Sequence, residues 1–318
     1  MLIAGPNLTI DRTLRIADLR PGEVLRFDES HVTAGGKGVN VARAARALGV
    51  PATLVGFTPG RTGAAVAGLI EDEGLAVVPV PVSGEVRSAA VILERSGRVT
   101  VLNEPGPKLR EGDWERYEEA VVVHLAGHRV VVASGSLPPA APPEAYARLV
   151  AAARRAGAQT IVDASGVHLE HALAARPEVA CPNLGEAEKL LGLGAGGAFD
   201  EQGAEVVQRA LRAAMELHER GADTAVVTAG GAGAALALAG RARHLPAARV
   251  AVTNPIGAGD AFASGLAAGI EDGRPRGDAV AYGMACAAAV VEVGITGTPA
   301  RARIEELYGR FELEGRPA

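Results

Sequence analysis

Short β-rich runs alternate with longer Ala-, Leu- and Arg-rich segments along most of the chain, and this alternation limits the possible folds more than any other feature. Runs such as Val130-Val131-Val132 are apolar throughout, without the polar alternation of a strand that has one face in water. Such strands, separated by helices, predict an α/β fold with a mostly parallel central sheet flanked by helices on both faces. With 318 residues, 48% of them apolar, the chain is long enough for one large α/β domain or two ordinary ones.

The same pattern gives bounds for the clearest elements. Beside the opening run Leu2-Ile3-Ala4-Gly5, it predicts strands at 52–57, 129–133, 160–163 and 225–228. It predicts helices at 39–48, 63–73, 143–155, 204–219, 258–271 and 278–291. We expect 194–197 to be a flexible loop and the residues from Glu312 onward to be frayed. Because no linker separates independent units, residues 1–318 are expected to form a single domain.

Two insertions, residues 12–33 and 85–103, interrupt the alternation of strands and helices. Both resemble short strands separated by turn residues such as Pro21-Gly22. In the second insertion, Ser96-Gly97 separates two β-rich runs, 89–93 and 98–102, in the pattern of a β-hairpin. The insertions are therefore predicted to pair into a small, discontinuous β-sheet, which could close over a substrate as a lid. An edge extension or a dimerisation surface is the alternative, and the two roles are compatible.

Charge and cysteine content argue against several classes of site. The net charge of -5 and the absence of a Lys and Arg cluster argue against nucleic-acid binding. Cys181 and Cys286 lie far apart and outside any CxxC spacing, so we expect two small buried residues rather than a disulfide framework or a zinc site. The chain opens without the features of a signal peptide, and no uncharged apolar stretch reaches the roughly 18 residues of a membrane span. A cytoplasmic protein that binds neither nucleic acid nor membrane is expected.

The segment Asn254-Pro255-Ile256-Gly257-Ala258-Gly259-Asp260-Ala261-Phe262 is a glycine-rich turn that leads into an Ala-rich helix. A helix start offers unpaired N–H groups and the positive end of the helix dipole, and Gly257 and Gly259 carry no side chain that would obstruct an anion. Such a site can stabilise a transferring phosphoryl group, while Asp260 could accept the proton of an incoming hydroxyl. The alternative is that Asp260 only caps the helix and the glycines only form a tight turn.

A second glycine cluster, Ala34-Gly35-Gly36-Lys37-Gly38-Val39-Asn40, also leads into a helix. Adjacent glycines allow a polyhydroxylated ligand to lie against the backbone, and Asn40 can both donate and accept hydrogen bonds. Asn7 and Asp11 follow the first strand, near the carboxyl ends of parallel strands where ligands collect. Asp11 could bind a pair of sugar hydroxyls. A turn followed by a helix start, and an ordinary Asx turn, are the alternatives for these two segments.

Together, GGKGVN at 35–40 and NPIGAGDAFASG at 254–265 resemble the two signature regions of the ribokinase-like (PfkB) carbohydrate kinase family. Their order and separation match as well, and the resemblance covers essentially the whole chain. Consistent with this, the sequence has no GxxxxGK[ST] loop, no HExxH and no strand-linked GxGxxG, which weakens a dehydrogenase hypothesis. The resemblance implies a doubly wound central sheet with a small β-sheet lid, ATP and Mg²⁺ as cosubstrates, and transfer of the γ-phosphoryl group to a sugar hydroxyl.

The resemblance also implies roles for individual residues. Asp260 would be the catalytic base, and Gly257, Ala258 and Gly259 would form the anion hole. The sugar contacts would be Asp11, Gly35, Gly36 and Asn40.

Two further segments would bind the nucleotide and its metal. PNLGE at 182–186 resembles the family's NxxE motif, which places Asn183 beside the phosphates and Glu186 near Mg²⁺. TAGGAG at 228–233 matches the strand and loop that line the nucleotide in the family. The implied nucleotide contacts are Asn183, Thr228, Gly230, Gly233, Gly257 and Gly259.

Three other segments, LNEPGP at 102–107, SGSLPP at 134–139 and DASG at 163–166, resemble the phosphofructokinase and tagatose-6-phosphate kinase branch, whose acceptors already carry a phosphate. A second phosphate needs its own cations, and Arg26 and Arg87 lie in the two insertions where the branch places phosphate-binding arginines. Asn103 and Ser136 complete the implied acceptor contacts. Cys181 stands where the branch commonly has Lys. Without the resemblance, Arg26 and Arg87 would be interpreted as solvated surface residues.

These observations predict an ATP-dependent kinase of a phosphorylated ketohexose. Fructose 1-phosphate is the favoured acceptor, giving fructose 1,6-bisphosphate, with fructose 6-phosphate and tagatose 6-phosphate as alternatives. The competing hypotheses are a kinase of an unphosphorylated sugar or nucleoside, and a sugar-binding regulator that has lost turnover. Lys37 is left out of the catalytic set because its ammonium could point to solvent or pair within the lid. A homodimer formed through the lid is expected.

Overall fold

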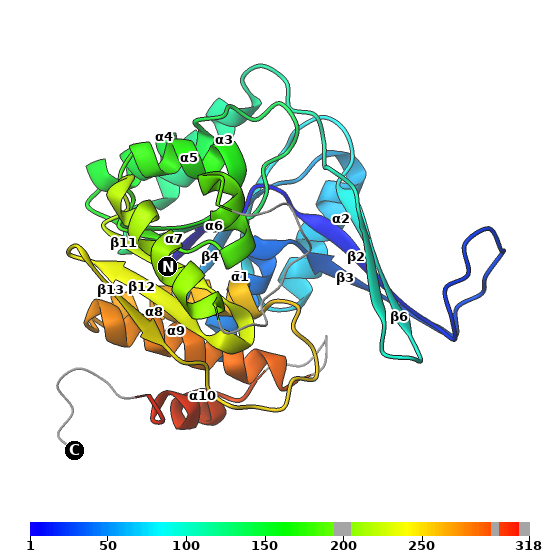
Figure 1. The fold of residues 1–318 in the computed structure, drawn as a ribbon. Helices are drawn as coiled ribbons and strands as arrows, with labels where there is room; N and C mark the ends of the chain where they lie inside the picture. Colours follow the sequence, from blue (N-terminus) through cyan, green and yellow to red (C-terminus); the bar gives the residue numbers. More distant parts are fainter. Residues whose placement is uncertain (194–204, 294–298, 312–318) are drawn as a thin grey trace.

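The computed structural model describes residues 1–193, 205–293 and 299–311. In these residues nine strands form one large sheet, in the order β13-β12-β11-β10-β9-β8-β1-β4-β5 (Figure 1). The strands are β1 (Leu2–Ala4), β4 (Thr53–Phe57), β5 (Ala76–Val80), β8 (Val130–Ser134), β9 (Gln159–Asp163), β10 (Val179–Ala180), β11 (Thr224–Thr228), β12 (Ala234–Leu238) and β13 (Arg241–Leu245). Every pairing is parallel except those of β12 with β11 and β13. The predicted doubly wound, mostly parallel sheet is confirmed.

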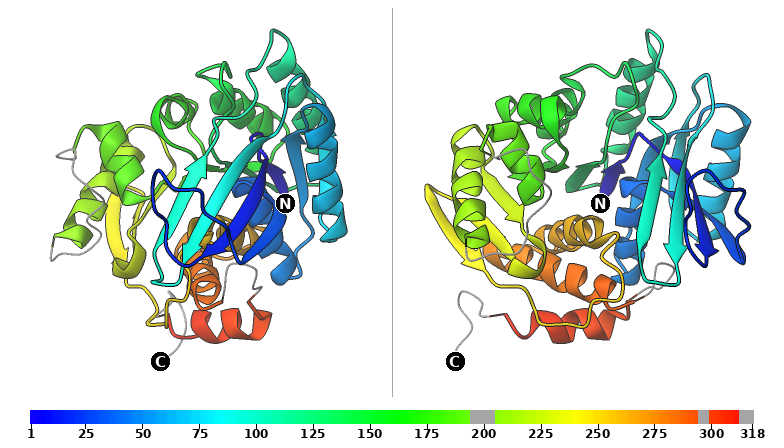
Figure 2. Two further views of the ribbon diagram at one scale, coloured as in Figure 1. Left: turned by 90° about the vertical axis from the view of Figure 1, so that its right-hand side faces the viewer. Right: turned by 45° about the vertical axis from the view of Figure 1, so that its right-hand side comes forward.

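Helices cover both faces of the large sheet, because its strands are apolar on both sides. One apolar core lies between the sheet and α1 (Lys37–Ala47), α2 (Gly60–Asp72), α8 (Ala258–Glu271), α9 (Arg276–Val291) and α10 (Arg301–Tyr308). The other lies beneath α3 (Asp113–His124), α4 (Ala145–Arg155), α5 (Gly166–Ala174), α6 (Leu184–Leu191) and α7 (Val206–Glu219). Within β1, Ile3 belongs to the first core, whereas Leu2 and Ala4 belong to the second. Figure 2 shows the two helical layers on opposite sides of the strands.

Strand β1 lies where the strand order reverses, with β4 and β5 on one side and β8 and the later strands on the other. In doubly wound sheets, ligands bind beyond the carboxyl ends of the strands at this switch point. The chain after β1 passes very close to the start of α1, since a Cβ atom added to Gly38 would lie 2.8 Å from the Cα of Gly5. The absence of side chains at these two positions therefore brings the first glycine cluster against the switch point.

A small sheet stands off the large one, in the strand order β3-β2-β6-β7 (Figures 1 and 2). Its strands are β2 (Thr9–Ile16), β3 (Glu29–Gly35), β6 (Arg87–Glu94) and β7 (Val99–Asn103). The predicted hairpin is present, with Leu93 opposite Val99, and β2 joins the two insertions by pairing in parallel with β6. The loop between β2 and β3 projects farthest from the body of the molecule (Figure 1). The predicted small sheet is confirmed.

All the predicted strands and helices are found, with ends that agree within three residues wherever both ends are described. Ala204, the loop predicted at 194–197 and the residues from Glu312 onward lie outside the described residues. Cys181 and Cys286 are buried and unpaired, as expected. No helix within the described ranges combines the length and the apolar character that crossing a membrane requires.

Candidate active site

Helix α8 begins at the glycine-rich segment. Gly257 is its N-cap and has a φ of 84°, a conformation that residues with a side chain rarely adopt. The side-chain oxygen of Asn254 accepts a hydrogen bond from the N–H of Ile256 at 3.1 Å, which holds the preceding turn. A Cβ atom added to Gly257 or Gly259 would meet no atom within 4 Å. The helix entrance, where the first N–H groups lack intrahelical partners, is therefore open to a ligand.

Asp260, in the first turn of α8, is only 6% exposed and contacts the first glycine cluster. Its Oδ2 accepts a hydrogen bond from Nδ2 of Asn40 at 2.8 Å. Burial raises the pKa of Asp260 to about 7; Lys37 opposes this rise, and the carboxylates of Asp163 and Glu186 add to it. A carboxyl group that titrates near neutral pH can act as a general base.

Lys37, at the start of α1, lies among these carboxylates. Its Nζ is 3.1 Å from both oxygens of Asp163 and 3.8 Å from Oε1 of Glu186. Burial acts to lower the pKa of Lys37, but Asp163, Glu186 and Asp260 outweigh it and hold the pKa above its ordinary value. The hydroxyl of Ser134 donates to Oδ2 of Asp163 at 3.0 Å. Three carboxylates thus surround one ammonium group, and the excess negative charge favours a further cation.

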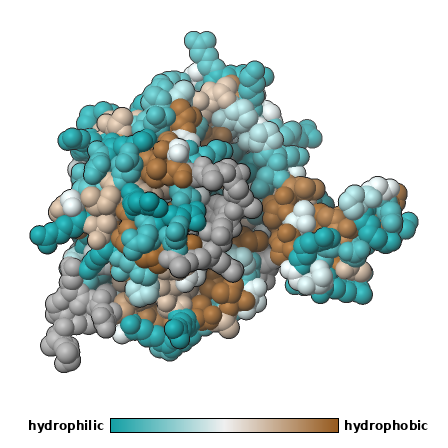
Figure 3. Space-filling model, in the orientation of Figure 1, coloured by the Kyte–Doolittle hydropathy of each residue, from teal (hydrophilic) through white to brown (hydrophobic). Residues whose placement is uncertain are grey.

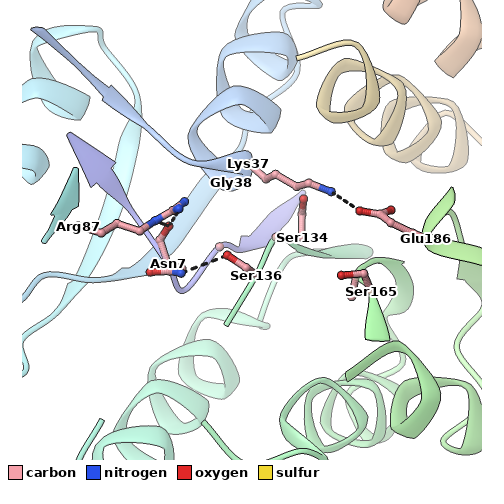
Figure 4. Close-up of a pocket in the computed structure, with 11 residues that line it drawn as sticks. Asn7, Lys37, Gly38, Arg87, Ser134, Ser136, Ser165 and Glu186 are labelled. Atoms are coloured by element: carbon pink, nitrogen blue, oxygen red, sulfur yellow. Dashed lines mark hydrogen bonds and ion pairs between the residues drawn. The ribbon is translucent and has the colours of Figure 1, made fainter. Parts of the chain in front are cut away.

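A cavity of about 210 Å³ opens beside Lys37 (Figure 4). Its walls come from the carboxyl ends of β1, β8 and β9, the starts of α1 and α6, and the first residue of β6. The lining residues are Gly5, Asn7, Lys37, Gly38, Arg87, Ser134, Gly135, Ser136, Ala164, Ser165 and Glu186. The cavity therefore lies at the switch point of the large sheet and beneath the small sheet.

Arg87 is the guanidinium on the small-sheet side of this cavity. Its Nε and Nη2 donate to the backbone oxygen of Asn7 at 3.3 and 3.2 Å, so a carbonyl rather than a carboxylate holds it. Burial lowers the pKa of Arg87, and Asp11 partly opposes that effect. A second cavity of about 610 Å³ shares Arg87 and Ser136 with the first and is also lined by Asn103. Arg87 is thus placed to bind an anion that enters either cavity.

Asp11, on β2, packs against the glycine pair. A Cβ atom added to Gly35 would lie 2.1 Å from Oδ2 of Asp11, so the contact requires glycine. Gly36 has a φ of 101° and lies against the backbone oxygen of Asn7. Burial raises the pKa of Asp11, and the positive charge of Arg87 is the main effect that opposes this rise. Oδ1 of Asp11 and Oδ1 of Asn7 are buried acceptors without a protein donor, which suits a ligand rich in hydroxyl groups.

Of the six expected nucleotide contacts, Gly257 and Gly259 lie at the start of α8, whereas the other four lie at the carboxyl ends of β10 and β11. Asn183 and Thr228 pair there in an isolated parallel bridge. Asn183 also caps α6: its Oδ1 accepts from the N–H of Glu186 at 2.9 Å, and Oε2 of Glu186 accepts from the N–H of Asn183 at 3.1 Å. This capping box leaves Oε1 of Glu186 facing Lys37.

Gly230 is the first residue of a short 3₁₀ helix after β11, Gly230–Ala232, and Gly233 follows that helix. A Cβ atom added to Gly233 would lie 2.1 Å from the backbone oxygen of Leu245. Packing against β13 is therefore sufficient to explain the glycine at 233.

Comparison with known proteins identifies the family. The model of the pfkB family carbohydrate kinases matches residues 7–303. The chain belongs to this family. This kinase is 33% identical to a 1-phosphofructokinase of Haloferax volcanii over 300 residues, which are 94% of this chain and 93% of that protein. It is therefore an ATP-dependent carbohydrate kinase.

Solved structures agree with this assignment. Phosphofructokinase-2 from Escherichia coli in complex with potassium matches with a TM-score of 0.87 at 26% identity, covering 97% of the kinase and 98% of that chain. A ribokinase of Arabidopsis thaliana shares the fold, with a TM-score of 0.74 at 21% identity over 96% of the kinase and 98% of that chain. The fold of the kinase is ribokinase-like, as predicted.

The acidic residues of the kinase fit a magnesium ion that is bound together with phosphates. Within the described ranges, no group of three or more His, Cys, Asp or Glu residues is arranged to hold a metal ion. Mg²⁺ needs fewer protein ligands, since it usually keeps several waters and binds through one or two carboxylates and substrate phosphates. Asp163 and Glu186 both contact Lys37, and burial raises the pKa of Glu186, so an added cation beside them would be stabilised.

The structure brings most of the predicted site residues of the kinase together, with one exception. Asp260 and Asn40 are in contact, Asp11 packs on the glycine pair, and Arg87, Ser136 and Asn103 line the cavities. Arg26 is exposed in the loop between β2 and β3 and lines neither cavity. Within one chain, Arg26 is therefore separate from the site.

Three residues at the centre of the site were not among the predicted ones. The predicted catalytic set omits Lys37, although it is a basic residue between glycines in the sequence. Ser134 and Asp163 are the last residues of β8 and β9. The rule that ligands collect at the carboxyl ends of parallel strands would have indicated both.

Proposed function

We propose that this kinase transfers the γ-phosphoryl group of ATP to the C6 hydroxyl of fructose 1-phosphate, as a 1-phosphofructokinase. The contact between Asn40 and Asp260 carries the proposal, because it joins a carboxyl with a pKa of about 7 to the glycine cluster expected to bind sugar. The 1-phosphofructokinase among its relatives supports this acceptor. Fructose 6-phosphate and tagatose 6-phosphate are the alternatives, because the same groups would bind acceptors of similar length.

In this proposal Asp260 is the general base. Its ionised carboxylate accepts the proton of the acceptor hydroxyl as that oxygen bonds to the γ-phosphorus and the bond to the departing ADP breaks. The N–H groups of Ala258 and Gly259 would hold the phosphoryl oxygens at the positive end of α8, where Gly257 permits the turn. The N–H of Ala258 would exchange its long hydrogen bond to the backbone oxygen of Pro255, 3.4 Å, for one to the phosphoryl group. Lys37 neutralises part of the negative charge around the reacting groups.

ATP would lie along the ends of β10 and β11. Asn183, Thr228, Gly230 and Gly233 are the proposed contacts, with Gly257 and Gly259 at the γ-phosphate end. Asp163 and Glu186 would hold Mg²⁺, which supplies positive charge to the phosphates when it is bound.

The acceptor would lie beneath the small sheet. Asp11, Asn40 and the glycine pair 35–36 would bind its hydroxyl groups, since Oδ1 of Asp11 lacks a donor. Arg87, with Ser136 and Asn103, would bind its phosphate. Arg26 could join them only if the small sheet moved or a second subunit brought it there.

We further propose that residues 12–33 and 85–103 are the lid of a single domain spanning 1–318, and that two lids pair in a homodimer. Apolar surface gathers on the projecting small sheet (Figure 3). The large apolar side chains exposed on its strands are Val32 at 44%, Val99 at 45%, Val101 at 43% and Leu102 at 60% exposure, and Phe27, in the loop between β2 and β3, is 52% exposed. Apolar side chains clustered on one surface favour a partner. The buried, unpaired cysteines fit a cytoplasmic location.

A coupled assay of ADP release tests the acceptor. Fructose 1-phosphate, fructose 6-phosphate, tagatose 6-phosphate, fructose and ribose are compared, and fructose 1-phosphate is expected to give the highest kcat/KM. Arg87→Ala is expected to raise KM for the sugar phosphate by about 10- to 100-fold, because a charge-assisted contact is lost. Arg15→Ala, on the same sheet but with an exposed side chain, is the matched control and leaves KM unchanged. Ribose or fructose as the best acceptor, with an unchanged KM in Arg87→Ala, would refute the proposal.

A further inference from the structure

Arg43, one helical turn after Asn40 on α1, makes an unusually complete set of contacts for a side chain that is 27% exposed. Its Nε and Nη2 form two hydrogen bonds to the carboxylate of Glu73, at 2.7 and 2.5 Å, which anchors the guanidinium to the end of α2. Nη2 also donates to the backbone oxygen of Ala34 at 2.7 Å, beside the glycine pair. The remaining nitrogen, Nη1, donates to Oδ1 of Asn40 at 3.1 Å.

This last contact fixes which way the Asn40 amide points. A guanidinium has only donors, so the atom of Asn40 that faces Arg43 must be the oxygen. The NH₂ group of the same amide is then directed at Oδ2 of Asp260. Rotating the amide by 180° would place its NH₂ against the donors of Arg43 and its oxygen against a carboxylate, so both contacts would become repulsive.

We propose that Arg43 is a positioning residue for Asp260, acting through the orientation of the Asn40 amide. The proposal rests on the proposed role of Asp260 as the base. Held in this way, Asn40 occupies Oδ2 and leaves Oδ1 of Asp260 for the acceptor hydroxyl. Glu73, Arg43, Asn40 and Asp260 thus form one chain of hydrogen bonds that runs from α2 through α1 to α8.

Geometry, rather than charge alone, is the expected basis of this effect. A lysine at position 43 would keep the positive charge, but an ammonium lacks the planar fork that holds Glu73, the Ala34 carbonyl and Asn40 together. Charges that face Asp260 come from Lys37 on α1, Asp163 on β9 and Glu186 on α6. Those near Arg43 are Glu73, at the end of α2, and Asp11 on β2. Arg43→Lys leaves all of these groups in place.

A double-mutant cycle on full-length kinase tests the proposal, with the acceptor that the wild type turns over best. Arg43→Ala and Arg43→Lys are each expected to lower kcat/KM by about tenfold or more, as for a charge-assisted contact. In an Asn40→Ala background, Arg43→Ala is expected to lower kcat/KM by less than about twofold further, because the amide through which Arg43 acts on Asp260 is already absent. The acid limb of kcat/KM, near pH 7 in the wild type, should move to higher pH in both Arg43 variants, since the Asn40 hydrogen bond lowers the pKa of Asp260.

Arg303→Ala is the matched control. It removes another two-bond pair to a carboxylate, Glu292, in a side chain of similar exposure on α10. The control is expected to keep both kcat/KM and the acid limb of the wild type. Additive losses in the cycle, or an Arg43→Lys variant with wild-type rate and pH profile, would overturn the proposal. If Arg43→Ala fails to fold, the rate and pH profile of Arg43→Lys test the proposal by themselves. An active Asp260→Asn variant would instead refute the base itself.

Discussion

The carboxyl group of Asp260 binds a proton more readily in the folded chain than in the unfolded one, because burial raises its pKa from 3.8 to about 7. Between these two values the folded chain holds more protons, so the free energy of unfolding decreases as the pH rises. The ionised carboxylate therefore destabilises the fold at neutral pH and above.

At the scale of this residue, we predict that Asp260→Asn raises the melting temperature at about pH 8 and changes it little at about pH 4. The reason is that the amide removes the buried charge only where the wild type is ionised. Thermal unfolding followed by calorimetry measures both values. Asp72→Asn, at an exposed aspartate, serves as the control and should show no such difference. A lower melting temperature for Asp260→Asn at about pH 8 would contradict the assigned environment.

Single site residues could be predicted from the sequence where they belong to a recognisable local motif. Asp260 and Asn40 each stand in a glycine-rich segment, and the structure joins them by a hydrogen bond between residues 220 positions apart. The sequence alone does not show that these two residues meet, nor that Lys37 meets Asp163, 126 positions away. The sequence therefore does not assign Lys37 to the site, because its surroundings in the fold, not its neighbours in the chain, decide whether it points to solvent or into the site. The sequence does not indicate Arg43 either, because its contact to Glu73 depends on how α1 and α2 pack.

The start of α8 makes a prediction at the scale of elements. Gly259→Ala is expected to keep or slightly raise the melting temperature, since a Cβ atom there meets no neighbour and alanine favours helix by up to about 1 kcal/mol. Turnover is expected to fall by about tenfold or more, because the methyl group would occupy the space in front of the helix N–H groups.

Gly68→Ala is the control for this test. Gly68 lies within α2, and a Cβ atom added to it also meets no neighbour within 4 Å. Its turnover should match the wild type. Full activity in Gly259→Ala would show that phosphoryl oxygens do not bind at this helix start.

Elements were predictable where the apolar pattern is long or continuous. Helix α8 has the predicted bounds, and β8 shifts by one residue from the prediction. The shorter or less regular elements α3, α5, α6, α10, β5, β10, β12 and β13 were not predicted. Strand β10 has two residues, too few for any periodicity, and β12 is AALAL, which has no β-branched residue to indicate a strand. Pairing with β11 and β13 makes β12 a strand, and this depends on tertiary structure.

At the scale of the whole molecule, we predict a dimer that depends on the small sheet. Light scattering coupled to gel filtration should give a dimeric mass for the wild type at micromolar concentration. Leu102→Glu, which places a charge on the exposed β7, should give a monomer. Val123→Glu on α3, at a valine that is 65% exposed, is the control and should remain dimeric. A monomeric wild type, or a dimer unaffected by Leu102→Glu, would contradict pairing through the lid.

The measurement that tests the central claim most directly is ADP release by Asp260→Asn with ATP, Mg²⁺ and fructose 1-phosphate, alongside equilibrium binding of both substrates. The account predicts a folded variant that binds ATP and fructose 1-phosphate as the wild type does, yet turns over at least about a thousandfold more slowly, because the proton of the acceptor hydroxyl has no base. Turnover close to that of the wild type would show that the carboxyl at the start of α8 is not the group that activates the acceptor.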